Sequence, residues 1–161
     1  MLKVLLVEDE NLIRRGLQYK MDWTEVNCVV VGEAATGQEG LAQIKALRPD
    51  IVITDIKMPD MDGMTLIREA KEKYPGTQFV ILSGYAEFEY AETAIELGVK
   101  SYLLKPISND ELKRVMRKLF ETLEKERQME VEIFRKHQLE TEQKGWLQEK
   151  AVNHLWQDNA A

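Results

Sequence analysis

Five short apolar segments alternate with longer amphipathic segments along the first part of this chain. The short segments are rich in Val and Ile, lack period-two alternation and are too short for helices, which is typical of strands buried on both faces of a parallel sheet. Their alternation with helical segments predicts an α/β sandwich around a parallel five-stranded sheet. The expected strands are Val4 to Val7, Val26 to Gly32, Ile51 to Thr54, Phe79 to Ser83 and Ser101 to Leu104.

The segments between the expected strands carry apolar residues at the three- and four-residue spacing of a helix. We expect these residues to face the sheet, and we expect Gly98 to end its helix as a glycine C-cap. The three stripes are Leu41, Ile44 and Leu47, then Ile67, Ala70 and Tyr74, then Ala91, Ala94 and Ile95.

The composition changes near residue 107, after which charged residues and Gln become frequent. Ser108 or Asn109 is expected to cap one long helix, which runs from 109 to about 143 and is interrupted at Gly145. Its heptad pattern soon meets charged residues, so a solvated helix and a paired helix both remain open. The apolar stripe at its start comprises Leu112, Val115, Met116, Leu119 and Leu123.

Charge and cysteine content exclude several classes of function. The net charge of -6 argues against a general nucleic-acid binder, which needs a basic face. One cysteine and two histidines cannot form a disulfide or an ordinary zinc site, so Cys28 is expected to be a small buried apolar residue.

No apolar stretch approaches the roughly 20 residues of a spanning helix, and the N-terminus lacks the features of a signal peptide. We therefore expect no membrane contact and a cytoplasmic location.

Acidic, hydroxyl and ammonium groups lie where separate strands end. Glu8 and Asp9 follow the first strand, Asp55 follows the third, Ser83 closes the fourth and Lys105 follows the fifth. The carboxyl ends of parallel strands open on one edge of the sheet, so these groups are expected to share a pocket. Clustered carboxylates need a cation, and Mg²⁺ prefers hard oxygen ligands and also accepts phosphate oxygens. The pattern therefore predicts a divalent-metal site for phosphoryl transfer.

Four motifs, in this order and strand context, resemble the response-regulator receiver family. They are VLLVEDE at 4–10, DIKMPDMDG at 55–63, LSGY at 82–85 and LLKP at 103–106. The resemblance covers about residues 1–122, which we predict to be the receiver domain, and leaves 123–161 as a helical extension or linker. It implies a flavodoxin-like, doubly wound α/β fold with a parallel sheet of order 2-1-3-4-5 and five flanking helices, the last extended at the C-terminus.

The resemblance implies that Asp55 is a nucleophile, which takes a phosphoryl group from a sensor histidine kinase or a small acyl phosphate. Asp9, Asp55 and the backbone carbonyl of Lys57 would bind Mg²⁺ or Mn²⁺, with Glu8 holding a coordinated water. Such a protein is a switch that is phosphorylated on itself, and not an enzyme acting on a separate substrate.

The same resemblance assigns the change of state to three residues. Lys105 would pair with the phosphoryl oxygens as a compact charge, Ser83 would move its hydroxyl toward them, and Tyr102 would follow inward. Together they would form a small bistable element that new charge biases toward one state.

Four further residues receive structural or rate-setting roles. A cis peptide bond is expected before Pro106, and Gly63 is expected to close a turn where positive φ is useful. Lys57 and Tyr85 flank the phosphoryl group in the family and tune its hydrolysis, so they are candidates for setting its lifetime.

Met21-Asp22-Trp23 and the segment 82–105 resemble receivers that precede AraC-type DNA-binding modules. This favours an output in transcription through a DNA-binding domain outside this chain. The alternative is a receiver that acts through its long terminal helix. A homodimer would use either the face formed by the fourth helix, the fifth strand and the fifth helix, or the C-terminal helix.

Other phosphate-handling proteins fit the sequence less well. The glycine spacing from Gly32 to Gly37 is that of a P-loop, but Gln38 and Glu39 follow where Lys and Ser or Thr are required. Phosphatases of the haloacid dehalogenase type use a strand-end aspartate but need a second acid where this chain has Lys57. A receiver-shaped module that is never phosphorylated would lack one of the acids or the lysine, and all of them are present.

Overall fold

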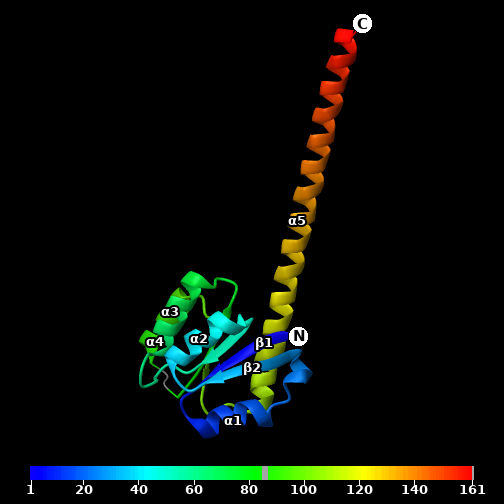
Figure 1. Ribbon diagram of the computed structural model, residues 1–161. Coiled ribbons are helices and arrows are strands. Elements are labelled where there is room, and N and C mark those ends of the chain that lie inside the picture. Colours follow the sequence, from blue (N-terminus) through cyan, green and yellow to red (C-terminus); the bar gives the residue numbers. More distant parts are fainter. Residues whose placement is uncertain (85–86, 161) are drawn as a thin grey trace. The chain divides into compact units, whose positions relative to one another are not determined.

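The computed structural model describes the backbone of residues 1–84 and 87–160, and the side chains up to residue 143 within those ranges (Figure 1). Five parallel strands form one sheet in the order β2-β1-β3-β4-β5. This is the predicted doubly wound α/β fold. The strands are β1 (Leu2–Val7), β2 (Cys28–Ala34), β3 (Ile51–Thr54), β4 (Gln78–Ser83) and β5 (Ser101–Leu104).

In the described ranges, five α-helices and one 3₁₀ helix connect and follow the strands. The main core cluster lies between one face of the sheet and the second, third and fourth helices, with Phe79, Ile44 and Ile67 at its centre. Alternate strand residues such as Leu6 and Val80 are equally buried and face the opposite way. The helices are α1 (Asn11–Lys20), η1 (Trp23–Val26), α2 (Gly37–Leu47), α3 (Gly63–Lys73), α4 (Phe88–Glu96) and α5 (Asn109–Ala160).

The second strand begins two residues later than predicted, because the chain first makes a 3₁₀ turn. Asp22 accepts a hydrogen bond from the Thr24 N–H and so begins η1. Asn27 then takes a left-handed conformation with φ 59°, which ends η1 and starts the strand at Cys28. Val26 is buried, as its apolar character suggested, but within this turn.

The stripe predicted for α4 is only partly correct. Ala94 is buried against the core, whereas the Ile95 side chain is 78% exposed. The two residues are 100° apart on a helix, and α4 turns the smaller side chain toward the sheet. Gly98 follows the helix with φ 71°, as expected for a glycine C-cap.

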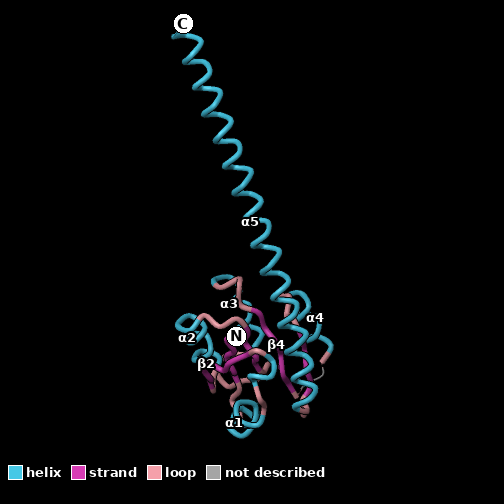
Figure 2. The backbone as a smooth tube through the Cα atoms, turned by 90° about the vertical axis from the view of Figure 1, so that its right-hand side faces the viewer, coloured by secondary structure: helices cyan, strands magenta, loops and turns pink. Residues whose placement is uncertain are grey.

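The last helix is longer than predicted. Ser108 caps it by accepting a hydrogen bond from the Glu111 N–H, and the helix continues through Gly145 to Ala160 (Figure 2). The predicted interruption at Gly145 is therefore wrong. A glycine inside a helix costs about 1 kcal/mol relative to alanine, which disfavours a helix without ending it.

The chain divides into two compact units, Met1–Phe120 and Glu121–Ala161. The first contains the whole sheet and the start of α5, and the second is helical throughout the part that the structure describes. All side chains from residue 125 to residue 143 are exposed. Among the described residues, every helix is too short or too polar to cross a membrane.

Candidate functional site

The residues singled out in the sequence follow the carboxyl ends of β1, β3 and β5. Backbone hydrogen bonds continue the sheet pattern one step past these strands. The Asp55 N–H donates to the Val7 carbonyl at 3.1 Å, and the Lys105 N–H donates to the Ser83 carbonyl at 2.8 Å. The Glu8 N–H likewise donates to the Ala34 carbonyl at 3.0 Å. The site residues are therefore held by the sheet itself rather than by flexible loops.

Three carboxylates meet at this edge of the sheet. Glu8, Asp9 and Asp55 each offer one carboxylate oxygen, and these oxygens all lie within 4.8 Å of one another. Glu8 is 2% exposed and Asp55 is 6% exposed, while Asp9 is half-buried. Buried carboxylates this close repel one another unless a cation joins them.

Lys105 supplies a cation to two of the three acids. Its Nζ lies 2.7 Å from Glu8 Oε2 and 3.0 Å from Asp55 Oδ2. Burial opposes the charge on the ammonium, but the hydrogen bonds to Glu8 and Asp55 outweigh burial and raise the pKa of Lys105 above its ordinary value. One ammonium thus bridges the two most deeply buried acids of the site.

Glu8 is the acid whose ionisation the site disfavours most. Burial, aided by the nearby charge of Asp55, raises the pKa of Glu8 to about 7, although the hydrogen bond from Lys105 opposes this rise. Its second carboxylate oxygen, Oε1, accepts a hydrogen bond from the Glu10 N–H at 3.2 Å. The site therefore stabilises the neutral form of Glu8 relative to an exposed carboxyl group.

Asp55 is oriented by its immediate neighbours. Its Oδ1 accepts a hydrogen bond from the Ile56 N–H at 2.7 Å, which leaves Oδ2 to face Lys105. The Thr54 hydroxyl donates to the Asp55 backbone carbonyl at 2.9 Å. The carboxylate therefore has a fixed orientation, as a nucleophile needs.

Ser83 and Tyr102 lie together beside this group. Ser83 is fully buried, and Tyr102 is half-buried and packs against the core cluster. Burial raises the pKa of the Tyr102 phenol, and Tyr90, Glu87 and Asp55 add to this rise, while a hydrogen bond with Ser83 opposes it. The Ser83 hydroxyl and the Tyr102 phenol, which were paired from the sequence, are thus joined by a hydrogen bond.

Gly63 has a different role from the one predicted. Positive φ among the described residues occurs at Asn27, Arg48 and Gly98, and not at Gly63, which begins α3. A Cβ at Gly63 would lie 2.0 Å from the Asp55 carbonyl oxygen. Glycine is therefore required here by the close approach of two backbone segments, and its N–H donates to the Ile56 carbonyl at 2.7 Å.

The remaining predicted residues lie around the site in different ways. The peptide bond between Lys105 and Pro106 is cis, the expected isomer. The Lys57 side chain is exposed, and the role of its carbonyl as a metal ligand remains a prediction. Tyr85 lies outside the described residues.

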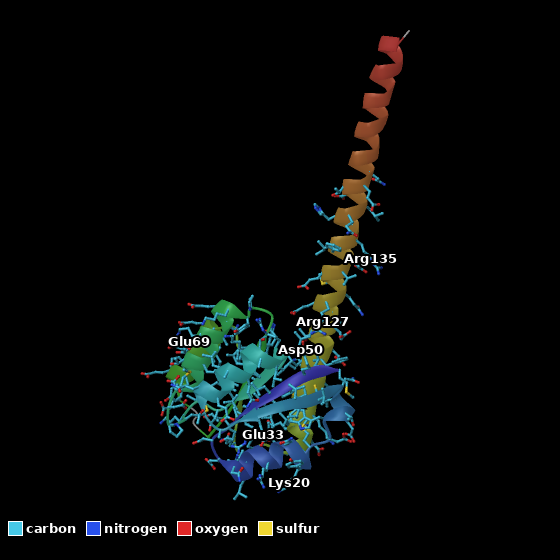
Figure 3. The ribbon with its side chains drawn as sticks, viewed as in Figure 1. Lys20, Glu33, Asp50, Glu69, Arg127 and Arg135 are labelled. Atoms are coloured by element: carbon cyan, nitrogen blue, oxygen red, sulfur yellow. The ribbon has the colours of Figure 1, made fainter. Side chains whose placement is uncertain are left out.

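Arg14 and Asp60 form hydrogen bonds that were not predicted from the sequence, and Arg14 contacts a site residue directly. Arg14 of α1 donates through Nη1 to the Glu8 carbonyl at 2.7 Å, and its Nε lies 3.5 Å from a carboxylate oxygen of Glu33, which is labelled in Figure 3. Asp60 accepts hydrogen bonds from the N–H groups of Gly37 and Gln38. Most of these partners are backbone groups, which no pattern of side chains reveals.

The donor set fits a hard divalent cation. Three carboxylates and one ammonium leave the site with an excess of negative charge, and all ligand atoms that the acids offer are oxygens. Mg²⁺ and Mn²⁺ favour such oxygen ligands, whereas zinc sites ordinarily use Cys and His. The three acids are therefore the residues that could hold such a cation, with a single ammonium beside them.

Comparison with known proteins agrees with this geometry. Residues 4–117 match the response regulator receiver domain family. The chain is 43% identical over 112 residues to the uncharacterized transcriptional regulatory protein YesN of Bacillus subtilis. The aligned region covers 70% of this chain and 30% of YesN. It is 37% identical to the uncharacterized transcriptional regulatory protein YhcZ of the same organism, covering 69% of this chain and 51% of YhcZ. The chain thus spans about half or less of these curated relatives.

Solved structures show the same fold. The receiver domain of AraT, a response regulator from Geobacillus stearothermophilus, superposes with a TM-score of 0.73 at 44% identity, covering 78% of this chain and 98% of that one. A CheY-like receiver domain protein from Methanospirillum hungatei superposes with a TM-score of 0.71 at 28% identity, with the same coverage. This chain therefore belongs to the response regulator receiver domain family and carries the receiver domain of a two-component response regulator.

Proposed function

We propose that Asp55 accepts a phosphoryl group from a sensor histidine kinase in a Mg²⁺-dependent reaction, and that this modification switches the domain between two states. The observation that carries the proposal is the position of Asp55. It is 6% exposed at the end of a central strand, with Lys105 Nζ at 3.0 Å and two further carboxylates within 4.8 Å. Receivers of this family interact with histidine kinases, which supports the choice of donor.

The chemical step is a transfer between two nucleophiles. A carboxylate oxygen of Asp55 attacks the phosphorus of a phosphohistidine, forming an O–P bond while the N–P bond breaks. The electron pair of the broken bond stays on the imidazole nitrogen, which takes up a proton. Asp55 thereby becomes an acyl phosphate, and Lys105 keeps its positive charge beside the new oxygens.

The acids would hold the metal that such a transfer requires. Asp9 and Asp55 would be direct ligands together with the Lys57 carbonyl, and Glu8 would hold a coordinated water. When bound, Mg²⁺ or Mn²⁺ supplies positive charge that offsets the oxygens of the phosphoryl group. Lys105, which contacts Glu8 and Asp55 at 2.7 and 3.0 Å, is then free to pair with the phosphoryl group instead.

The change of state would pass through Ser83 and Tyr102. The Ser83 hydroxyl would turn from Tyr102 toward the phosphoryl oxygens, because a dianionic group is a stronger acceptor than a phenol. Tyr102 would then adjust its packing against the core cluster. Lys57 and Tyr85 would set the lifetime of the phosphorylated state.

The output would lie in transcription. YesN and YhcZ are transcriptional regulatory proteins longer than this chain, which supports an output in transcription. A DNA-binding domain of the AraC type outside this chain stays a prediction from the sequence. A homodimer would form through the α4–β5–α5 face, which exposes Phe88, Ile95 and Leu104, or through the C-terminal helix.

Labelling with acetyl phosphate and Mg²⁺ tests the assignment of Asp55. We expect the wild-type protein to gain one phosphoryl group and Asp55→Asn to gain none, measured by intact mass. Asp62→Asn is the matched control, because Asp62 lies in the same loop but caps α3 through the Thr65 N–H. Labelling of Asp55→Asn at the wild-type level contradicts the proposal.

Beryllofluoride distinguishes a switch from a receiver-shaped module that is never phosphorylated. We expect saturable changes in the NMR chemical shifts of the backbone amides around Ser83 and Tyr102 when beryllofluoride and Mg²⁺ are added together. Asp55→Asn should show no such change. A wild-type spectrum that stays unaltered would support the module that is never phosphorylated.

A further inference from the structure

The loop between Asp55 and Asp62 is tied to a distant helix by one side chain. Asp60 accepts a hydrogen bond through Oδ1 from the Gly37 N–H at 3.0 Å and another through Oδ2 from the Gln38 N–H at 2.9 Å. Gly37 and Gln38 are the first two residues of α2, whose N–H groups have no partner within the helix. Asp60 thus joins the loop after β3 to a helix that begins 23 residues earlier.

The contact between loop and helix is also close in its backbone. A Cβ at Gly37 would lie 2.7 Å from the Cβ of Met61 and 2.9 Å from the Met61 carbonyl oxygen. The loop is therefore pressed against the first turn of α2, beside the two hydrogen bonds of Asp60. At its far end, the loop is held by Gly63 against the Asp55 carbonyl.

Asp60 is not needed as the only cap of α2. Thr36 is the N-cap residue, and its hydroxyl accepts a hydrogen bond from the Glu39 N–H at 3.1 Å. Glu39 in turn accepts a hydrogen bond from the Ala35 N–H at 3.3 Å. This local cap uses residues of α2 and its approach alone. The bond from Asp60 therefore adds a connection between two parts of the fold beyond what the helix itself requires.

The charge of Asp60 suits this connection. The hydrogen bond from the Gln38 N–H, followed by that from Gly37, lowers the pKa of Asp60, although partial desolvation opposes this effect. The carboxylate is therefore ionised at neutral pH and lies at the positive end of the α2 dipole.

From this geometry we infer that Asp60 is a positioning residue for the metal site. Lys57 lies midway between Asp55 and Asp60 in the loop, and its backbone carbonyl is the metal ligand of the proposed function, on which this inference rests. Asp55 is fixed by the sheet and Asp60 by α2, so the carbonyl between them has a restricted position. Residues that hydrogen-bond to metal ligands typically change metal affinity by 10- to 100-fold. Asp60 bonds to α2 and would act on the Lys57 carbonyl through the loop, so we expect an effect at the low end of that range.

Mg²⁺ binding to the full chain, measured by isothermal titration calorimetry, tests the inference without using phosphoryl transfer. We expect Asp60→Ala to weaken Mg²⁺ binding about 10-fold. Thr36→Ala is the matched control, because it removes a cap from the same helix and leaves the loop attached. Both substitutions remove a cap from α2 and should destabilise the fold by a similar amount, but Thr36→Ala should change the Mg²⁺ affinity less than twofold.

A second variant covers the case in which Asp60→Ala folds poorly. Asp60→Asn keeps one carbonyl acceptor and should weaken Mg²⁺ binding less than Asp60→Ala does. Equal Mg²⁺ affinity in the Asp60 variants and in Thr36→Ala would overturn the inference and reduce Asp60 to a helix cap. Failure of the proposed function would instead be seen in the wild-type protein, as absence of Mg²⁺ binding and of labelling on Asp55.

Discussion

The same kinds of side chain occupy two contrasting environments in this molecule. At the carboxyl edge of the sheet, Glu8 and Asp55 are almost fully buried and share the ammonium of Lys105. Residues 125–143 of α5 contain five Glu, two Lys and two Arg, yet every side chain in this range is exposed, as Arg127 and Arg135 illustrate in Figure 3.

Burial determines how strongly a charged side chain affects its neighbours. Interactions between buried charges are several times stronger than those in water, and their protonation responds to small changes nearby. Exposed ion pairs are worth about 0–1 kcal/mol, because water and salt screen them. Composition alone does not separate the two regions. The fold separates them by bringing acids from different strands to one edge.

The largest expected contrast comes from one substitution made in both regions. Gly63→Ala places a methyl group against the Asp55 carbonyl oxygen and should lower the free energy of unfolding by about 4 kcal/mol. Gly145→Ala replaces a glycine within α5 and should raise helix stability by about 1 kcal/mol. Urea unfolding measures the first change, and helix content by circular dichroism measures the second.

The essential result is that Gly63→Ala lowers stability whereas Gly145→Ala raises it. If Gly63→Ala unfolds at the wild-type urea concentration, the close approach of the two backbone segments is not present in solution. The requirement for glycine at the start of α3 would then need another explanation.

The next contrast removes a lysine from each region. Lys105→Met leaves Glu8 and Asp55 buried without their shared cation and should lower the free energy of unfolding at pH 8 by about 3 kcal/mol. Lys136→Met, in the exposed part of α5, should change it by less than about 0.5 kcal/mol. Urea unfolding in the presence of EDTA measures both. Equal effects of the two substitutions would show that the ammonium at the site is solvated.

A smaller contrast concerns pH. The pKa of Glu8 rises from its ordinary value of 4.5 to about 7 on folding, so its neutral form stabilises the fold below pH 4.5 and this stability is lost as the pH rises through 7. Glu8→Gln does not titrate. From pH 5 to pH 8 in EDTA, the wild type should therefore lose about 2 kcal/mol of unfolding free energy that Glu8→Gln keeps.

Glu132→Gln is the matched control for this titration, because Glu132 is exposed on α5. Its unfolding free energy should follow that of the wild type at every pH. A Glu8→Gln variant that also follows the wild type would show that Glu8 is ionised normally, and hence that it is not desolvated.

The sequence was sufficient to predict the parallel sheet and the proximity of the site residues at one edge of it. The strands Ile51–Thr54 and Ser101–Leu104 have the predicted bounds, because short apolar runs between helices leave little choice of register. The position of Glu8, Asp9, Asp55 and Lys105 follows from one rule, that parallel strands end on the same edge.

What the sequence did not reveal depends on backbone geometry and on small energies. Asp60 and Arg14 act on backbone N–H and carbonyl groups, which have no signature in the sequence. Gly63 is needed for a close approach between segments, which cannot be told from a need for positive φ by composition. Gly145 was misjudged because one glycine costs a helix only about 1 kcal/mol. Ile95 was misjudged because the rotation of α4 depends on its packing against the sheet, and neighbouring residues on a helix differ by 100°.

Of the 28 acidic residues in this chain, we propose that Asp55 alone is phosphorylated. The most direct test is to incubate the wild-type protein with acetyl phosphate and Mg²⁺, reduce the acyl phosphate with borohydride, and map the product by mass spectrometry. Reduction converts a phosphorylated aspartate to homoserine. We predict homoserine at Asp55 alone. Homoserine at Asp9, or spread among exposed acids of the chain, would contradict the claim.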